Sequence, residues 1–276
     1  MRRRDFLIGL AAAGLLGCGP SAEAQPPFEP TRFSVEVRGT GPDVILIPGL
    51  TAGPDVWAST VSAVPGYRYH LVHVAGMAGA APRGNASGAI VAPLAEEIVR
   101  YIASRRLARP AIVGHSMGGT LAMMVAARRP ELVGPIMVVD MFPQPSGLLG
   151  SSPDRMRGLA DGLRDLAATS GGRRLLDSLI GSFGTNSRSG RSDPDVVGRA
   201  MHELAAVDLT PDLAAIRAPL TVVYASHNDG ARVRAFERAY AGAAGASFVR
   251  IDDSGHMVMF DQPARFHEAV RSFLAN

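Results

Sequence analysis

The sequence predicts an α/β fold with a mostly parallel sheet flanked by helices. From residue 31 onward, short apolar runs alternate with amphipathic stretches, which is the pattern of parallel strands joined by helices. Of the 276 residues, 47% are hydrophobic and 19% are charged, so the chain can bury a large core and is not disordered as a whole. Both observations favour one large domain, which we expect over residues 32–276.

The segment before this domain has the features of an export signal. Residues 1–24 begin with a basic segment and continue with an apolar run from Phe6 to Leu16, which is too short to span a bilayer. Arg3 and Arg4, followed by Asp-Phe-Leu, resemble the twin-arginine signal and predict the Tat export machinery as a partner. An ordinary secretory signal is the alternative. In both cases we expect an exported protein, periplasmic or in the cell envelope.

Two cleavage sites in this segment remain open. Leu15-Leu16-Gly17-Cys18 resembles a lipobox, and cleavage before Cys18 would leave a lipidated first residue that anchors the protein to the membrane. Ala22-Glu23-Ala24 is an A-x-A site, and cleavage after Ala24 would give a soluble protein. Residues 25–31 contain three prolines, which predict a short extended spacer.

Strands and helices are expected in alternation along the domain. The expected strands are Arg32–Arg38, Val44–Ile47, Tyr69–Val74, Ala111–Val113, Ile136–Val139, Leu220–Tyr224 and Ser247–Ile251. The expected helices lie near residues 54–63, 93–106, 117–128, 232–241 and 263–274.

Residues 143–212 interrupt the alternation. They show no strand pattern, but they contain helical stretches at Arg155–Ala168 and Val196–Ala206, separated by the polar run Gly184–Asp195, which predicts a loop. A helical cap inserted between two strands explains this pattern. A single α/β crossover is the alternative, although so long a link without regular structure would be unusual.

Composition excludes several kinds of chemistry. All 28 basic residues are arginine, so neither a lysine Schiff base nor a P-loop lysine is possible. Cys18 is the single cysteine, which leaves the domain without a disulfide, a thiol nucleophile or a Cys-ligated metal. The net charge of +3 is too small to indicate a nucleic-acid partner. The histidines show no metal-ligand spacing, and we expect neither a metal nor a cofactor.

A candidate nucleophile lies in Gly114-His115-Ser116-Met117-Gly118, which fits G-x-S-x-G. The pentapeptide alone is a weak signal, but a β-branched pair precedes it and a good helix sequence follows it. This context predicts a sharp strand-to-helix turn that presents Ser116 Oγ above the sheet, at a helix N-terminus that favours developing negative charge. A structural glycine turn is the alternative. We expect His115 to pack beneath the turn.

Three blocks of sequence resemble the α/β-hydrolase family of serine hydrolases. They are Ile47-Pro48-Gly49-Leu50, GHSMGG at Gly114–Gly119, and Ser254-Gly255-His256. The resemblance covers Arg32–Leu274 and implies the α/β-hydrolase fold with an inserted helical cap at about residues 143–212. It is specific for fold and reaction type but not for substrate. Pro48-Gly49 departs from the His-Gly of many members, which makes the first oxyanion loop less standard.

The resemblance also implies an oxyanion hole and a base. Backbone N–H groups of Leu50 and Met117 occupy the family's oxyanion positions, with plain core packing as the alternative for Leu50. A serine hydroxyl needs a neutral imidazole to accept its proton. His256 follows the expected strand Ser247–Ile251, in a loop at a strand's carboxyl end, and it occupies the position of the family's catalytic histidine.

The third member of the triad, a carboxylate that orients the histidine, has two candidates. Asp229 follows the expected strand Leu220–Tyr224 at the usual family position, and we prefer it. Asp140 ends the strand Ile136–Val139, from which some relatives supply their acid. Asp252 and Asp253 are too close in sequence to His256 to orient it easily.

These features predict a cofactor-free hydrolase of small carboxylic esters that works through an acyl-enzyme. Thioester, lactone and carbon–carbon hydrolysis use the same apparatus and stay open, whereas the family's aspartate-dependent chemistries are disfavoured by the serine at position 116. A ligand-binding protein with little turnover is the alternative from another class. We expect short to medium acyl chains, because the sequence lacks the long apolar surface helix of lipases.

Overall fold

The computed structural model describes residues 28–146, 154–155, 158, 161–162 and 191–275. The predicted signal, Cys18 and both cleavage sites lie outside the described residues, as do most of the predicted helix Arg155–Ala168 and residues 184–190 of the predicted polar loop. Four residues of the predicted spacer, Phe28 to Thr31, are described, and none of them lies in a helix or strand.

A seven-stranded sheet runs through the molecule in the order β1-β3-β2-β4-β5-β6-β7. Only β1 is antiparallel to its neighbour β3, and the remaining pairs are parallel. The strands are β1 (Phe33–Arg38), β2 (Asp43–Ile47), β3 (Arg68–Val74), β4 (Ala111–His115), β5 (Ile136–Val139), β6 (Leu220–Ala225) and β7 (Ser247–Ile251), each within two residues of its predicted bounds. The prediction of a mostly parallel sheet flanked by helices is confirmed.

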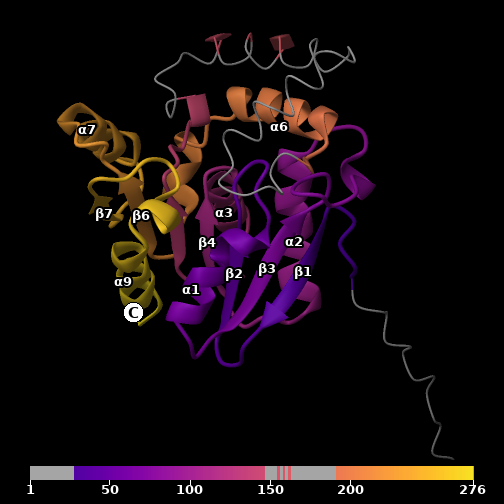
Figure 1. The fold of residues 1–276 in the computed structure, drawn as a ribbon, viewed down its shortest axis with the longest axis horizontal. Helices are drawn as coiled ribbons and strands as arrows, with labels where there is room; N and C mark the ends of the chain where they lie inside the picture. Colours follow the sequence, from indigo (N-terminus) through magenta and orange to yellow (C-terminus); the bar gives the residue numbers. More distant parts are fainter. Residues whose placement is uncertain (1–27, 147–153, 156–157, 159–160, 163–190, 276) are drawn as a thin grey trace, which may run out of the picture.

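Helices cover both faces of this sheet (Figure 1). Along β2, Ile45 and Ile47 point into one buried cluster and Val44 and Leu46 into the other, because successive strand residues face opposite sides. The first cluster includes α2 (Val91–Ser104), α3 (Met117–Arg128) and α7 (Gly230–Ala239), and the second includes α8 (Val258–Asp261) and α9 (Pro263–Ala275), next to α1 (Ala58–Ala63).

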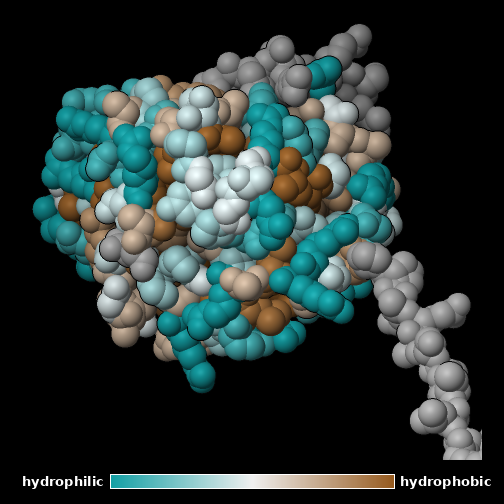
Figure 2. Space-filling view, turned by 90° about the horizontal axis from the view of Figure 1, so that it is seen from below, coloured by the Kyte–Doolittle hydropathy of each residue, from teal (hydrophilic) through white to brown (hydrophobic). Residues whose placement is uncertain are grey.

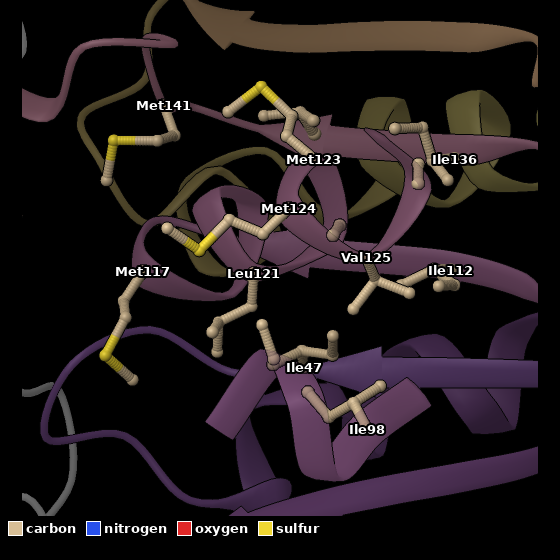
Figure 3. Close-up of a cluster of buried hydrophobic side chains, with 14 of the residues drawn as sticks. Ile47, Ile98, Ile112, Met117, Leu121, Met123, Met124, Val125, Ile136 and Met141 are labelled. Atoms are coloured by element: carbon tan, nitrogen blue, oxygen red, sulfur yellow. The ribbon is translucent and has the colours of Figure 1, made fainter. Parts of the chain in front are cut away.

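The helix α3 is buried on nearly every side. Figure 3 shows its residues Met117, Leu121, Met123 and Met124 among side chains from β2, α2 and β5. Every residue from Met117 to Ala126 is buried. A helix that is apolar all round belongs in a core, and dense packing leaves it little freedom to shift. The N-terminus of α3, which follows Ser116, is therefore held firmly at the end of β4.

Surface hydrophobic residues are scattered over the described part of the chain. On the face seen from below in Figure 1, they form separate patches between hydrophilic ones (Figure 2). Among all the described residues, the exposed large hydrophobic side chains are Val37, Phe248 and Phe260. Single exposed residues of this kind are ordinary on protein surfaces. None of the helices in the described ranges is long and apolar enough to cross a membrane.

The helix α6 (Pro194–Ala206) crosses the carboxyl end of the sheet, beyond the end of α2 (Figure 1). It lies within the predicted cap, and polar contacts fasten it to the loop after β3. Arg199 donates hydrogen bonds to the carbonyl oxygens of Gly88 and Asn85, both at 2.6 Å. Close packing also holds α6 against this loop: a Cβ on Gly76 would lie only 2.7 Å from Val196 Cγ2.

A carboxylate from α6 also caps α2. The residue before α2 is Ile90, which has no side chain able to accept from the free N–H groups of the first turn. Instead the Glu203 carboxylate accepts from Ile90 N at 2.8 and 3.0 Å and from Val91 N at 2.8 Å. This long-range cap places a negative charge at a helix N-terminus, where the dipole favours it.

Replacing Glu203 by alanine should lower the free energy of unfolding by about 1–2 kcal/mol, the usual cost of losing a helix N-cap. Urea denaturation measures this change. Glu96→Ala is the matched control, since Glu96 is an exposed residue of α2 that takes no part in the cap, and it should change the free energy by less than about 0.5 kcal/mol. Equal effects of the two substitutions would contradict the capping role.

Candidate active site

Ser116 occupies a sharp turn between β4 and α3. Its backbone is left-handed, with φ 53° and ψ −122°, a conformation that a non-glycine residue rarely adopts. The neighbouring glycines make the turn possible: a Cβ on Gly114 would lie 2.1 Å from Gly118 O, and a Cβ on Gly118 would lie 2.2 Å from Ile47 O. The predicted strand-to-helix turn is therefore present, with Ser116 at the carboxyl end of β4.

The loop after β7 brings His256 to the end of β5. His256 Nδ1 donates to Asp140 Oδ2 at 2.7 Å. Asp140 is fully buried, whereas the His256 side chain is 38% exposed. Asp140, like Ser116, has left-handed backbone, with φ 46°. Because Nδ1 carries the hydrogen that bonds to the carboxylate, Nε2 of the neutral ring is left free to accept a proton.

The preference for Asp229 as the partner of His256 is corrected by this geometry. Asp229 is the N-cap of α7, and its Oδ1 accepts from Ala231 N at 2.8 Å in an exposed position. Its capping role explains why an aspartate stands there without serving the histidine. The structure pairs His256 with Asp140, the other candidate from the sequence.

Asp140 has two further partners besides His256. Oδ1 accepts from Ala225 N at 3.0 Å, and Arg232 Nη2 lies 3.1 Å from Oδ1 and 3.2 Å from Oδ2. Burial by itself raises the pKa of Asp140. The hydrogen bond and charge of His256, the charge of Arg232 and the N–H of Ala225 outweigh burial and hold that pKa below its ordinary value. The carboxylate is therefore ionised, and both of its oxygens accept hydrogen bonds.

His115 connects the turn at Ser116 with the loop that carries His256. Its Nε2 donates to the His256 carbonyl oxygen at 2.9 Å, and the two rings lie 4.6 Å apart. His115 is buried, and its Nδ1 has no hydrogen-bond partner among the described residues. Burial and the nearby His256 lower the pKa of His115 to about 3. The ring is consequently a neutral donor, and it lies behind the turn as the sequence predicts.

Two backbone N–H groups are available at the predicted oxyanion positions. No hydrogen bond between described residues uses the N–H of Leu50 or of Met117. The loop that carries Leu50 lies against the turn, since a Cβ on Gly49 would be 3.0 Å from Ser116 Cβ. Thr51 has left-handed backbone, with φ 65°, and its carbonyl oxygen accepts from Ser192 Oγ at 3.3 Å. This contact ties the loop to the segment that enters α6.

Sequence reasoning missed Arg232. No sequence motif includes it, and it contacts Asp140 only because α7 packs beside the end of β5. A cation in the first turn of a helix, where the dipole disfavours it, was the available signal. No group of three or more His, Cys, Asp or Glu within the described ranges is arranged to hold a metal ion.

Comparison with known proteins identifies similar sequences and structures. Residues 44–269 match the sequence model described as the Alpha/beta hydrolase family. The chain is 29% identical over 202 residues to the pimeloyl-[acyl-carrier protein] methyl ester esterase of Nitrosospira multiformis, and the alignment covers 70% of this chain and 72% of that protein.

Two solved structures share the fold at low sequence identity. The enol-lactonase of Burkholderia xenovorans superposes with a TM-score of 0.70 at 20% identity, over 88% of this chain and 96% of that one. A thermophilic esterase from Thermogutta terrifontis superposes with a TM-score of 0.71 at 19% identity, over 88% of this chain and 93% of that one.

The lowered pKa of His115 predicts a pH-dependent loss of stability. The group titrates at 6.5 in the unfolded chain and at about 3 in the fold, so the unfolded state binds the extra proton between these values. Stability is complete above the unfolded value and falls as pH drops towards the folded value. Between about pH 7.5 and pH 5, this one group should lower the free energy of unfolding by about 2 kcal/mol.

Urea denaturation at the two pH values measures this change in the wild type and in His115→Gln. The glutamine amide can donate to the His256 carbonyl oxygen but does not titrate. The variant should lack the component of about 2 kcal/mol. An identical pH dependence in both proteins would show that His115 does not carry it.

Proposed function

Because the chain belongs to the alpha/beta hydrolase family, we propose that it is a serine hydrolase that cleaves carboxylic esters through an acyl-enzyme intermediate. The observation that carries this proposal is the pairing of His256 with the buried, ionised Asp140. His115, the residue before Ser116, holds the loop of His256 through a hydrogen bond to the His256 carbonyl oxygen. The esterase and lactonase similarities support the same reaction class.

In the acylation step, Ser116 Oγ attacks the acyl carbon of the ester while His256 Nε2 takes the hydroxyl proton. The imidazolium that forms lies beside the carboxylate of Asp140, which keeps Nδ1 protonated and stabilises the positive charge. Collapse of the tetrahedral intermediate breaks the bond to the alkoxy oxygen. The leaving alcohol takes its proton from His256, and the acyl group remains on Ser116.

Negative charge on the carbonyl oxygen needs donors that are in place before the reaction. The N–H groups of Leu50 and Met117 suit this role, because neither is used within the described residues and both belong to segments that border Ser116. Met117 opens α3, so the helix dipole adds to the stabilisation.

Deacylation repeats the steps with water as the nucleophile. His256 Nε2 takes a proton from water, the hydroxide oxygen attacks the acyl carbon, and Ser116 Oγ recovers the proton as the acid is released. No cofactor or metal is required by this sequence of steps. We expect small esters with short to medium acyl chains to be the substrates.

The acid of the triad can be identified by two matched substitutions. Asp140→Asn should lower kcat by roughly 10³- to 10⁴-fold, because the amide no longer holds the histidine in the required tautomer. Asp229→Asn should keep near-full activity, since asparagine caps a helix about as well as aspartate. Ester turnover and circular dichroism measure both effects. Loss of turnover in folded Asp229→Asn with Asp140→Asn active would reverse the assignment.

Labelling with a fluorophosphonate tests whether the protein is an enzyme or a binding protein on the same fold. We expect rapid labelling of the wild type and none of Ser116→Ala, because only an activated serine reacts with the probe. A panel of p-nitrophenyl esters of increasing acyl length then defines the preference, with Glu268→Ala, at an exposed position on α9, as a surface control. Absence of labelling in the wild type would favour a binding role, and turnover only of long-chain esters would contradict the expected chain length.

A further inference from the structure

Arg232 is fixed beside the acid of the proposed triad by several contacts. Its Nη2 lies between the two oxygens of Asp140, and its Nε donates to the carbonyl oxygen of Ala225 at 2.8 Å. The guanidinium also stands 5.3 Å from the centre of the Phe236 ring. Its side chain is only 17% exposed. These contacts hold the guanidinium of Arg232 next to the carboxylate of Asp140.

The position of Arg232 in its helix is unfavourable without such a partner. It is the third residue of α7, whose N-cap is Asp229, and the positive end of the helix dipole disfavours a cation in the first turn. The buried charge of Asp140 offsets this cost. Asp229 therefore stabilises the helix start that holds Arg232 against Asp140, although it does not contact His256 itself.

We propose that Arg232 is a positioning residue that sets the acid limit of activity, by neutralising the buried Asp140 carboxylate and so weakening proton uptake by the Asp140–His256 pair. This inference rests on the proposed ester hydrolysis. The reaction requires an unprotonated Nε2 and an ionised carboxylate. Uptake of one proton by the pair, on either residue, stops it. A pair with a net negative charge in a buried site holds such a proton more tightly than one whose charge an arginine cancels.

Other groups around the pair do not replace Arg232. His115, from β4, stays neutral because its pKa is about 3. Tyr240, at the end of α7, is buried with a raised pKa and donates to Met141 O. Asp252 accepts from Ser226 and pairs with Arg250, while Asp261 of α8 accepts from Gly255 N. Arg232 is the cation among the described residues that contacts Asp140.

The test is the pH dependence of kcat/KM for a p-nitrophenyl ester between about pH 5 and pH 9. Arg232→Gln and Arg232→Met should move the midpoint of the acid limb upward by roughly one to two pH units. Arg232→Lys keeps the charge, and its midpoint should stay within roughly half a unit of the wild type. Arg234→Met is the matched control: it removes an exposed arginine from the same helix and should leave the midpoint in place.

An unmoved midpoint in folded Arg232→Gln or Arg232→Met would overturn the inference, and so would an equal shift in Arg234→Met. If Arg232→Met fails to fold by circular dichroism, Arg232→Gln decides, because the amide can still donate to Asp140. Asp140→Asn separates the two proposals. An inactive Asp140→Asn with an unmoved midpoint in Arg232→Gln rejects the role of Arg232 alone, whereas a fully active Asp140→Asn rejects the triad on which it rests.

Discussion

The arrangement of the site depends on the interactions of one buried carboxylate, that of Asp140. It stands at the end of β5, accepts from the backbone of β6, pairs with Arg232 on α7 and holds His256 on the loop after β7. A buried charge is tolerated only when its partners satisfy it. The four segments therefore have to meet at this point, and their meeting fixes the orientation of the histidine relative to the sheet.

A second constraint is the close approach of the chain to itself around Ser116. The left-handed turn requires glycine on both sides, because side chains there would overlap the backbone of β2 and of α3. The strain of such a turn is held in place by its surroundings. The helix α3, buried from Met117 to Ala126, supplies that restraint on one side, and the parallel strands supply it on the other. The packing of the core thus also fixes the backbone conformation of Ser116.

A few polar contacts between segments that are distant in the sequence hold the loops around Ser116 and the helix α6 in place. His115 supports the loop of His256 as a neutral donor, and Ser192 links the segment before α6 to the loop of Leu50. Glu203 and Arg199 fasten α6 across the carboxyl end of the sheet. These contacts supplement apolar packing, because Val196, Ala200 and Leu204 of α6 belong to the same buried cluster as α2 and α3.

The sequence by itself determined the strands of the sheet and the strand-to-helix turn at Ser116, and it identified Ser116 and His256 as candidate catalytic residues. The pattern of apolar residues located the strands within two residues, because this pattern depends only on residues that are close together in the sequence. Ser116 and His256 were predictable, because each has a local motif or a place in the loop order. Only the tertiary structure shows that His256 contacts Asp140 and not Asp229, and that Arg232 lies beside that carboxylate. Both carboxylates follow parallel strands, and which of them meets a histidine 116 positions from Asp140 depends on how α7 and the last loop pack.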